Sequence, residues 1–289
     1  MARAVSTPAL DYLIIGHVTV DRVEKRRVRF GGTAAYAALT ARSLGMRVGV
    51  LTSAAFEPAL VDILTDICVA RVPAEFTTQF VNHYDLLRRR EQHLEAVAEP
   101  LQPGHVLPEW LDSPIVHLAP LAQEVDPALA GCFPRALLGI TPQGWLRAWD
   151  EQGLVRPTDW RDADALLERA DAVVLSEEDV ARPEQIPELA ARTRLLVATQ
   201  GKRGASVYCR GQPPRRSPAF RAERETDPTG AGDVFAAAFL IHLKQSGDPL
   251  EAADMANCVA SFAVERVGIG GVPSLEHVRA RWAAGKRHR

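Results

Sequence analysis

The sequence predicts an α/β fold in which a doubly wound, mostly parallel sheet is flanked by helices. Two observations predict this fold. Short apolar segments typical of buried strands alternate with helical segments between residues 114 and 199. These strands also end in polar residues, as expected where the carboxyl ends of parallel strands form one ligand-binding edge. No linker or internal repeat divides the 289 residues, so residues 1–289 are expected to form a single domain.

The first third of the chain contains extended regions that can pair as a small lid. In chain order the pattern predicts a strand at 12–15, a hairpin within 17–29, a helix at 33–44, a strand at 48–52, a helix at 57–66 and two extended segments within 77–98. The alanine-rich helix should end before Gly45, because glycine readily adopts the left-handed conformation that closes a helix.

The rest of the chain alternates between strands and helices and then becomes helical. The pattern predicts strands at 114–119, 136–140, 172–175 and 194–199, helices near 126–131, 161–169 and 184–192, a β-meander over 201–209, and helices at about 231–246, 249–266 and 274–284. This alternation is typical of parallel strands joined by right-handed crossovers. The polar residues at the strand ends, among them His117, Thr141 and Thr199, should surround one site, although strand ends are polar in any such fold.

The composition excludes several classes of protein. Hydrophobic residues make up 47% of the chain, charged residues 24%, and the formal net charge is −2. A general nucleic-acid-binding protein normally carries a basic excess, so that class is not expected. The longest apolar run, 234–241, is far too short to span a bilayer, so no membrane anchor is expected. The four cysteines are far apart in the sequence, which favours reduced thiols in the cytoplasm over a zinc site or disulfides.

The stretch from Asp227 to Asp233 has the chemistry of an anion-binding loop at the start of a helix. Gly230 and Gly232 let a ligand approach the backbone closely, and the N–H groups of a first helical turn favour phosphate oxygens. Asp233 falls in this turn, where a carboxylate can act as a base. Glycine and aspartate are also ordinary capping residues. The following run 234–241 is apolar on every side, which predicts a buried helix and favours a functional role for the carboxylate at its start.

This stretch resembles the C-terminal signature of the PfkB, or ribokinase-like, carbohydrate kinases, Asp-Thr-x-Gly-Ala-Gly-Asp-x-Phe. The matching residues are Asp227, Gly230, Ala231, Gly232, Asp233 and Phe235, with Pro228 where the family usually has threonine. The resemblance covers about residues 11–273 and implies a ribokinase-like fold with a small β lid at about 17–30 and 77–98. It also implies ATP-dependent transfer of phosphate to a hydroxyl, with Asp233 as general base and the loop before it as the seat of the phosphate charge.

On the acceptor side, the resemblance implies that Asp21, Gly31 and Gly32 contact substrate hydroxyls. Aspartate can accept hydrogen bonds from two neighbouring hydroxyls, and glycine lets a sugar lie against the backbone. Asp21 is equally compatible with a turn, and the glycine pair with the start of a helix. The family commonly has asparagine four residues after the second glycine, where this chain has Tyr36.

A second segment, 141–147, follows a predicted strand and offers Gln143, Trp145 and Arg147 to a ligand, although tryptophans more often fill a core. Together with residues 117–120, the short lid and the Gly-His-Val at 16–18, this segment most resembles the inositol kinase branch of the family.

On the donor side, the sequence has no P-loop, so a nucleotide must be held in another way. The residues that the resemblance implies for the donor are Thr199, Gly201, Gly204, Asp227, Asn257 and Gly268, and those implied for Mg²⁺ are Glu178 and Asp179. Asp227 would also lie near a monovalent cation such as K⁺, which is common among relatives. Asn257 can instead make a buried hydrogen bond, and the acidic residues at 177–179 can simply favour the start of a helix.

These residues lead to one hypothesis and one alternative. The hypothesis is a kinase that uses ATP and Mg²⁺ to phosphorylate a small polyol, sugar or nucleoside, as a monomer or homodimer without nucleic-acid or membrane partners. The alternative is a ligand-binding or regulatory protein with the same fold and little catalysis. Tyr36 and the changed motif at 176–179 favour the alternative. The intact Gly-Ala-Gly-Asp at 230–233 favours the enzyme, because a sensor has no need of a base.

Overall fold

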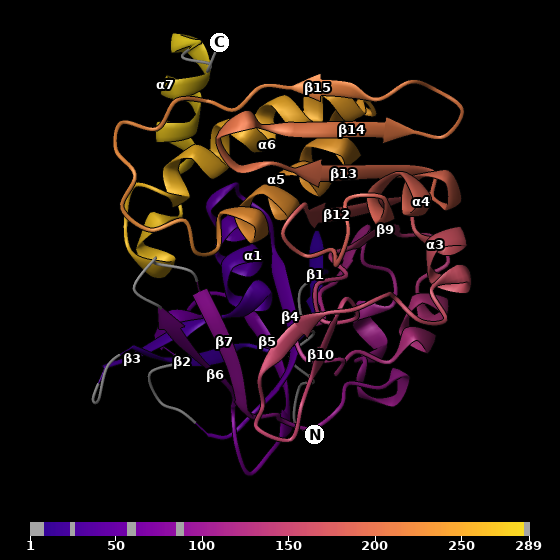
Figure 1. Cartoon of the computed structure of the whole chain (residues 1–289), viewed down its shortest axis with the longest axis vertical. Coiled ribbons are helices and arrows are strands. Elements are labelled where there is room, and N and C mark those ends of the chain that lie inside the picture. The colour runs from indigo at the N-terminus through magenta and orange to yellow at the C-terminus, as the bar shows by residue number, and fades with distance from the viewer. Residues whose placement is uncertain (1–8, 24–26, 57–61, 85–89, 286–289) are drawn as a thin grey trace, which may run out of the picture.

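The computed structural model describes residues 9–23, 27–56, 62–84 and 90–285. A central nine-stranded sheet carries helices on both faces, and a separate four-stranded sheet lies beside it (Figure 1). The predicted fold class, a doubly wound α/β sheet with a small β lid, is confirmed.

The central sheet is parallel except at one edge. In spatial order its strands are β15 (Arg215–Ser217), β14 (Ala205–Cys209), β13 (Leu195–Thr199), β12 (Ala172–Ser176), β9 (Leu137–Ile140), β8 (Ile115–Leu118), β1 (Tyr12–Ile15), β4 (Val48–Ala54) and β5 (Cys68–Pro73). The pairs from β13 to β5 are parallel, whereas β14 and β15 pair antiparallel. Both faces of β1 are buried, which explains why residues 12–15 are apolar without alternation.

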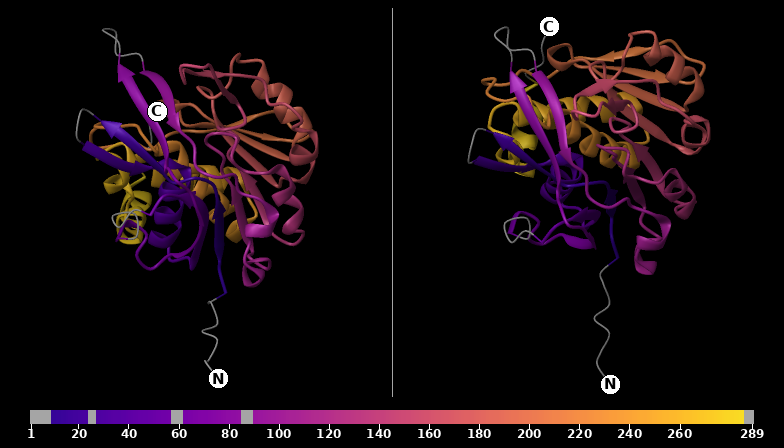
Figure 2. Two further views of the ribbon diagram at one scale, coloured as in Figure 1. Left: turned by 90° about the horizontal axis from the view of Figure 1, so that it is seen from below. Right: turned by 60° about the horizontal axis from the view of Figure 1, so that its bottom comes forward.

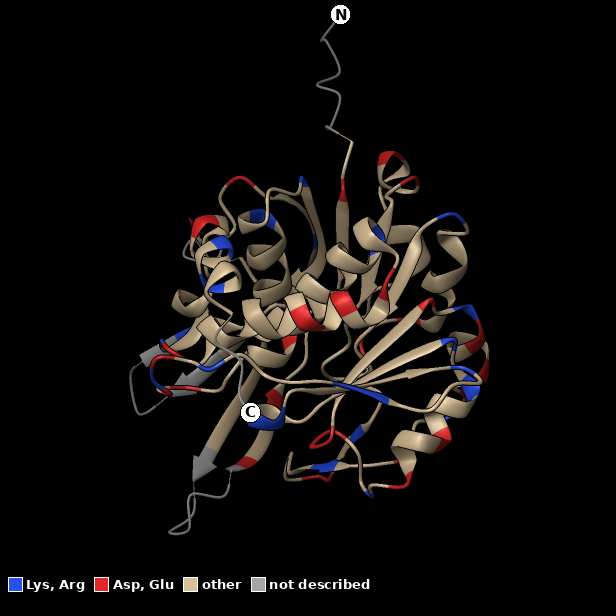
Figure 3. Cartoon of the chain, turned by 90° about the horizontal axis from the view of Figure 1, so that it is seen from above, with Lys and Arg blue, Asp and Glu red and all other residues tan. Residues whose placement is uncertain are grey.

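Two hydrophobic clusters fill the spaces on either side of the sheet. On one face lie α1 (Gly32–Ser43), α5 (Ala231–Ser246) and α6 (Pro249–Ala263), and α7 (Leu275–Ala284) packs against α6. On the other face lie the 3₁₀ helix η3 (Pro127–Cys132), α3 (Asp164–Arg169) and α4 (Gln185–Arg192). In the view of Figure 3, acidic and basic residues are interspersed along the loops and outer helices.

Helix α5 is the centre of the first of these layers. Its run 234–241 is buried along its whole length, as the apolar sequence predicts. The helix packs closely on β9, where Gly139 leaves room for Leu240. A Cβ atom on Gly139 would lie 2.3 Å from Cδ1 of Leu240. Residue 139 therefore faces α5.

The lid is a four-stranded sheet in the order β3 (Arg27–Gly31), β2 (Thr19–Val23), β6 (Thr78–Tyr84) and β7 (Arg90–Ala96). Figure 2 shows β6 and β7 standing out from the helical layers. A hairpin of β10 (Arg147–Trp149) and β11 (Val155–Pro157) lies against β7, where the N–H of Leu94 donates to the carbonyl of Gly153 at 2.8 Å. The extended segments expected at 17–29 and 77–98 are thus present and form one sheet.

Two expectations from the sequence change. Instead of an α-helix near 126–131, the structure has the 3₁₀ helix η3 at Pro127–Cys132, where the side chain of Asp126 accepts from the N–H of Ala128. The acidic residues at 177–179 lie in a turn, and α4 begins only at Gln185, so they do not start a helix. Of the helix expected at 57–66, residues 57–61 lie outside the described residues. Within the described chain, no helix is both long and apolar enough to cross a bilayer.

Candidate active site

The start of α5 is shaped by Gly230. This residue caps the helix with φ 81° and ψ −4°, in the left-handed region that favours glycine. A Cβ atom on Gly230 would lie 2.3 Å from Cε1 of Tyr36, a buried ring on α1. Backbone conformation and packing therefore both exclude a side chain at this position. The loop before α5 is held directly against α1.

Asp233 lies in the first turn of α5 and is half-buried. Its Oδ1 accepts a hydrogen bond of 2.8 Å from the hydroxyl of Thr33, in the first turn of α1. The preceding residue, Gly32, packs against the carbonyl of His17, just after β1, and against Leu121, just after β8. The first turns of α1 and α5 therefore meet at the carboxyl edge of the central sheet, with a partly exposed carboxylate between them.

The first turn of α5 also offers backbone donors. The N–H of Thr229 donates to Oδ1 of Asp227 at 3.0 Å, and the N–H of Ala231 donates to the carbonyl of Pro228 at 3.2 Å. The N–H groups of Gly230 and Gly232 find no acceptor within the described part of the chain. Amides at the positive end of a helix dipole favour an anion. The geometry therefore combines an acidic side chain and anion-binding amides in one turn.

The glycine pair expected to contact the acceptor lies at the same edge. Gly31 ends β3, and Gly32 begins α1 with φ 83°. A Cβ atom on Gly32 would lie 2.8 Å from the carbonyl oxygen of His17, so only glycine fits there. Asp21 lies on β2, paired with Arg29 of β3. The side chain of Asp21 is outside the described residues.

Glu124 organises the loops beside Gly32, and the sequence interpretation missed it. Its side chain is only 3% exposed. The carboxylate accepts hydrogen bonds from the N–H groups of His17 at 3.0 Å, Leu121 at 2.9 Å and Ala122 at 2.7 Å. Backbone donors can stabilise a buried carboxylate in this way. The only signal for it in the sequence is a single acidic residue within an otherwise uncharged loop, 119–125.

Gln143 and Asp179 are hydrogen-bonded to each other, whereas Arg147 lies on the hairpin of β10 and β11. Nε2 of Gln143 donates to Oδ1 of Asp179 at 2.8 Å, and the N–H of Ser176 donates to Oδ2 of Asp179 at 2.8 Å. Arg147 belongs to the hairpin strand β10 and is half-buried, and its carbonyl accepts from the side chain of Gln123 at 2.6 Å. Gln143 thus links the loop after β9 to the turn after β12.

The residues expected to contact the donor phosphates form the turn between β13 and β14. Thr199 ends β13, and its hydroxyl donates to the carbonyl of Leu175 at 3.3 Å. Gly201 has φ 56°, and a Cβ atom there would meet no atom within 4 Å. Gly204 has φ 90°, and a Cβ atom there would lie 2.1 Å from the carbonyl oxygen of Ser217. Gly201 therefore faces open space, while Gly204 is required by the packing of the turn.

Asn257 and Gly268 occupy different surroundings in the C-terminal part. Asn257 is 7% exposed, and its Nδ2 donates to the carbonyl of Ser217 at 3.1 Å and to the hydroxyl of Ser217 at 2.8 Å. This is a buried hydrogen bond, as the alternative held, but its partner lies on β15. Gly268 begins the 3₁₀ helix η5 (Gly268–Gly271) with φ 61°, and a Cβ atom there would lie 3.9 Å from the hydroxyl of Tyr36. Tyr36 therefore approaches both Gly230 and Gly268.

Asp227 connects the loop before α5 with the lid. Its carboxylate is 15% exposed, and Oδ2 lies 3.7 Å from Nη1 of Arg29 on β3. Because Oδ1 accepts from Thr229, both oxygens of Asp227 are engaged. An ion pair thus joins the lid sheet to the anion-binding loop.

Glu178 and Asp179 are the two residues that the sequence suggested for a divalent metal. Glu178 is exposed, and both oxygens of Asp179 accept hydrogen bonds from protein donors. Among the described residues there is no group of three or more metal-ligating side chains. Asp179 is therefore already committed to protein donors, whereas the exposed carboxylate of Glu178 remains accessible.

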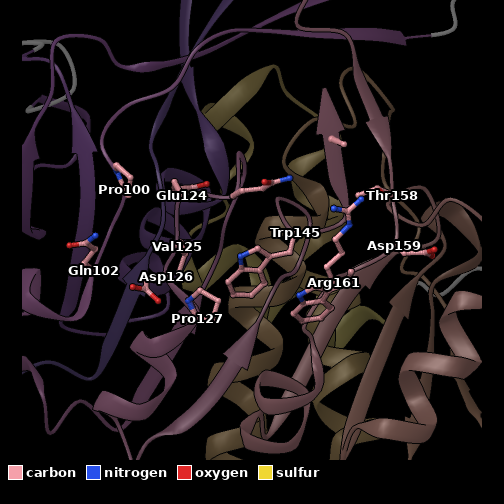
Figure 4. Close-up of a pocket in the computed structure, with 13 residues that line it drawn as sticks. Pro100, Gln102, Glu124, Val125, Asp126, Pro127, Trp145, Thr158, Asp159 and Arg161 are labelled. Atoms are coloured by element: carbon pink, nitrogen blue, oxygen red, sulfur yellow. The ribbon is translucent and has the colours of Figure 1, made fainter. Parts of the chain in front are cut away.

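Two other residues from the sequence interpretation are packed inside the protein. His117 lies next to the carboxyl end of β8, as expected, but its side chain is fully buried. Trp145 stacks on Trp160 with ring centroids 5.3 Å apart, on the η3, α3 and α4 face of the sheet. These rings line a cavity of about 450 Å³, in which Trp145 lies between Pro127 and Arg161 (Figure 4). Asp233 does not line this cavity.

Comparisons with known proteins agree on the type of protein. A family model described as pfkB family carbohydrate kinase matches residues 154–275, which include the loop 227–233. A cytidine kinase of Thermococcus kodakarensis is 27% identical over 270 residues, covering 84% of this chain and 91% of that protein. A fructokinase of Klebsiella pneumoniae is 34% identical over 165 residues, covering 52% of each protein.

Solved structures share the fold at low sequence identity. A pyrophosphate-dependent kinase in the ribokinase family, complexed with a pyrophosphate analog and myo-inositol, has a TM-score of 0.76 at 22% identity, covering 93% of this chain and 99% of that one. Arabidopsis thaliana ribokinase, complexed with ribose and ATP, has a TM-score of 0.73 at 18% identity, covering 95% and 99%. A Burkholderia thailandensis nucleoside kinase in complex with inosine has a TM-score of 0.75 at 20% identity, covering 96% and 99%.

Proposed function

We propose that this chain transfers the γ-phosphoryl group of ATP to a hydroxyl of a small polyol, sugar or nucleoside. The proposal is supported by the match of a pfkB family carbohydrate kinase model to residues 154–275, by the similarity to a cytidine kinase and by the ribokinase fold. Asp233 would be the general base. The observation that carries this proposal is the hydrogen bond from Thr33, which orients a half-buried carboxylate beside the amides of Gly230 and Gly232.

The proposed reaction needs alignment and charge stabilisation more than covalent chemistry. Asp233 would take the proton of the acceptor hydroxyl. At the same time the oxygen of that hydroxyl would form a bond to the γ-phosphorus of ATP, and the bond between this phosphorus and the oxygen of the departing ADP would break. The loop of Gly230, Ala231 and Gly232 would stabilise the negative charge on the transferred group through backbone N–H groups. A donor bound against α5 would therefore react next to the base.

The acceptor and donor sides are proposed as follows. Asp21, Gly31, Gly32, Gln143 and Arg147 would contact the acceptor, and Thr199, Gly201, Gly204, Asp227 and Gly268 the donor. Asn257 would act through Ser217, since its amide is committed to that residue. Glu178 and Asp179 would approach Mg²⁺ through water, and the bound Mg²⁺ would neutralise phosphate charge. A monovalent cation such as K⁺ beside Asp227 is part of the proposal, with Arg29 already supplying a positive charge there.

The relatives support several acceptors and two donors. Cytidine, fructose, myo-inositol, ribose and inosine are the acceptors that the names of the relatives and neighbours indicate, and the inositol kinase branch remains our proposal for the subfamily. Because one neighbour is pyrophosphate-dependent, pyrophosphate is the alternative donor to test. We further propose one domain over residues 1–289, a cytoplasmic location where ATP is available, and a monomer or homodimer.

The test is turnover of the wild-type protein and of an Asp233→Asn variant. Each donor, ATP or pyrophosphate with Mg²⁺, is incubated with each of the five acceptors, and product is followed by chromatography. We expect one acceptor to be phosphorylated and Asp233→Asn to lower turnover by about two to four decades. The matched control is Asp248→Asn at the start of α6, because asparagine also caps a helix well and Asp248 follows the C-terminal end of α5, whereas Asp233 lies in the first turn of that helix.

Two results would contradict the proposal. Near-normal turnover in Asp233→Asn would remove the mechanism. Saturable acceptor binding without any product in the wild type would instead favour the alternative, a ligand-binding or regulatory protein with this fold. Tyr36 favours that alternative only weakly in the structure, because its buried ring supports the loop at Gly230.

A further inference from the structure

Three polar side chains form a continuous row inside the central sheet, and the mechanism above uses none of them. The hydroxyl of Tyr12 on β1 lies 2.7 Å from Nδ1 of His117 on β8. Nε2 of His117 lies 3.0 Å from the hydroxyl of Thr141, which follows β9. Tyr12 and His117 are fully buried and Thr141 is 8% exposed. The row therefore starts in the core and ends at the carboxyl edge of the sheet.

The imidazole of His117 carries one proton for two partners. Burial lowers the pKa of His117 from 6.5 to about 3, so the ring is neutral at physiological pH. A neutral imidazole has one N–H donor and one acceptor nitrogen. The directions of the two flanking hydroxyls are therefore coupled, since one must donate to the ring and the other must accept from it.

The surroundings of Tyr12 decide between the two directions. No described residue other than His117 makes a hydrogen bond with the phenol of Tyr12. If Nδ1–H donated to Tyr12, the phenol proton would be buried without an acceptor, which costs about 1–3 kcal/mol. The phenol therefore donates to Nδ1, and Nε2–H donates to Thr141. This leaves the hydroxyl proton of Thr141 directed away from His117.

Thr141 faces the same side of the sheet as Asp233. Side chains two residues apart on a strand share a face, and Gly139 packs directly against Leu240 of α5. Asp233 precedes Leu240 by about 10 Å along the helix axis, and Thr141 lies about 7 Å beyond Gly139 toward the carboxyl end of β9. Measured from the contact between Gly139 and Leu240 toward the carboxyl edge of the sheet, Thr141 and Asp233 thus lie within about one helical turn of each other. Burial raises the pKa of Tyr12, and the negative charge of Asp233 raises it further, so Tyr12 lies within the electric field of Asp233.

We propose that Thr141 is an acceptor-binding residue whose hydroxyl donates to an oxygen of the acceptor, and that Tyr12 and His117 are positioning residues that fix the direction of this donor. The proposal rests on the proposed function for the identity of the ligand. A neighbouring hydroxyl oxygen of a polyol, sugar or nucleoside is the chemical partner that such a donor selects. A hydroxyl held by a buried, neutral row needs no reorientation when the acceptor binds.

The first test reads the tautomer of His117 without any ligand. Nitrogen NMR of protein labelled with ¹⁵N-histidine distinguishes the two tautomers, and His117→Gln assigns the signal. We expect the proton of His117 on Nε2. His17 is an internal reference, because its Nε2 lies 2.9 Å from the carbonyl of Glu99 and must donate to it. A proton on Nδ1 of His117 would overturn the proposal.

The second test measures acceptor affinity by calorimetry, with myo-inositol, ribose and cytidine as probes and no phosphoryl donor. For the probe that wild type binds most tightly, Thr141→Val should weaken binding about tenfold and Thr141→Ser should restore it to within about threefold. Tyr12→Phe should weaken binding about threefold, with no further loss in the Thr141→Val background. Thr193→Val is the control, since Thr193 is a buried threonine whose hydroxyl donates to helix α4.

The outcomes separate this proposal from the kinase proposal. Unchanged affinity in Thr141→Val, or an equal effect of Tyr12→Phe in both backgrounds, would show that the row is only structural. Because binding is measured without a donor, a wild type that binds an acceptor but never phosphorylates it contradicts the kinase while leaving the Thr141 result valid.

Discussion

A single hydrogen bond joins residues 200 positions apart, from Thr33 to Asp233. Neither residue is fully accessible, since Thr33 is 1% exposed and Asp233 is half-buried. A base that is held by a second side chain keeps the orientation needed for proton transfer. The sequence signature identified Asp233, but Thr33 is an ordinary residue in an alanine-rich helix. Only the contact between α1 and α5 shows that Thr33 donates to this carboxylate.

Gly230 should tolerate no side chain. We expect Gly230→Ala to lower the free energy of unfolding by about 2–5 kcal/mol, from the left-handed backbone and from overlap with the ring of Tyr36. Turnover should fall with it, because the amides of the loop would move. Urea denaturation and steady-state kinetics measure both effects.

The other end of the same helix supplies the control for Gly230. Gly247 has φ 71°, but a Cβ atom there would meet no atom within 4 Å. Gly247→Ala should therefore lower the free energy of unfolding by only about 1–2 kcal/mol, from the left-handed backbone conformation alone, and leave turnover intact. Equal losses in both variants would show that Tyr36 does not restrict the loop.

His117 should make the protein less stable in mild acid. The pKa of His117 is about 3 in the folded state and 6.5 ordinarily. Below pH 6.5 this imidazole therefore binds a proton in the unfolded chain but stays neutral in the folded chain. The stability is therefore complete above pH 6.5 and is lost progressively as the pH falls toward 3. Between pH 7 and pH 5 this histidine should lower the free energy of unfolding, measured by urea denaturation, by about 2 kcal/mol.

A variant isolates this contribution from those of other groups. His117→Gln should lose less stability than wild type between pH 7 and pH 5, by about the same 2 kcal/mol. An unaltered pH dependence in His117→Gln would mean that this ring is not the group responsible.

At the scale of elements, the sequence predicted long and regular segments better than short ones. The strands and helices with clear periodicity, such as 12–15 and 231–246, lie where expected. The hairpin strands β10 and β11 have three residues each, too few for a pattern, and their position depends on contact with β7. The edge strand β5 was also missed, because its exposed positions include the apolar Val69, so residues 68–73 do not alternate between apolar and polar types.

Gly153 couples the hairpin to the lid. It has φ 78°, and a Cβ atom would lie 2.4 Å from the carbonyl oxygen of Leu94. We expect Gly153→Ala to detach the hairpin from β7, so that amide exchange of Leu94, measured by hydrogen exchange, becomes faster. Gly211→Ala is the control, because Gly211 has φ 76° and open space around its Cα. Unchanged protection of Leu94 would show that β7 does not depend on the hairpin.

At the scale of the whole molecule, the sequence predicted the fold class and the similarity to PfkB carbohydrate kinases, and the structure supplied the contacts. The resemblance at 227–233 depended on local spacing, which a sequence displays directly. In contrast, the bonds of Asp179 to Gln143 and of Asn257 to Ser217 join segments about 40 residues apart. No local pattern can show that these polar groups already have protein partners. Proposed ligand contacts are therefore less predictable from sequence than the loop at 227–233.

Binding should stabilise the folded molecule even when catalysis is removed. The proposed acceptor residues come from the lid and from the edge of the central sheet, which are joined only in the folded state. At about 100 times its dissociation constant, an acceptor adds about 2.7 kcal/mol, which for a chain of this length is about 4 °C in Tm. Asp233→Asn should keep this shift while losing turnover, because the base acts mainly in the transition state. Loss of the acceptor-induced shift in this variant, measured by calorimetry, would mean that Asp233 instead holds the acceptor or the fold.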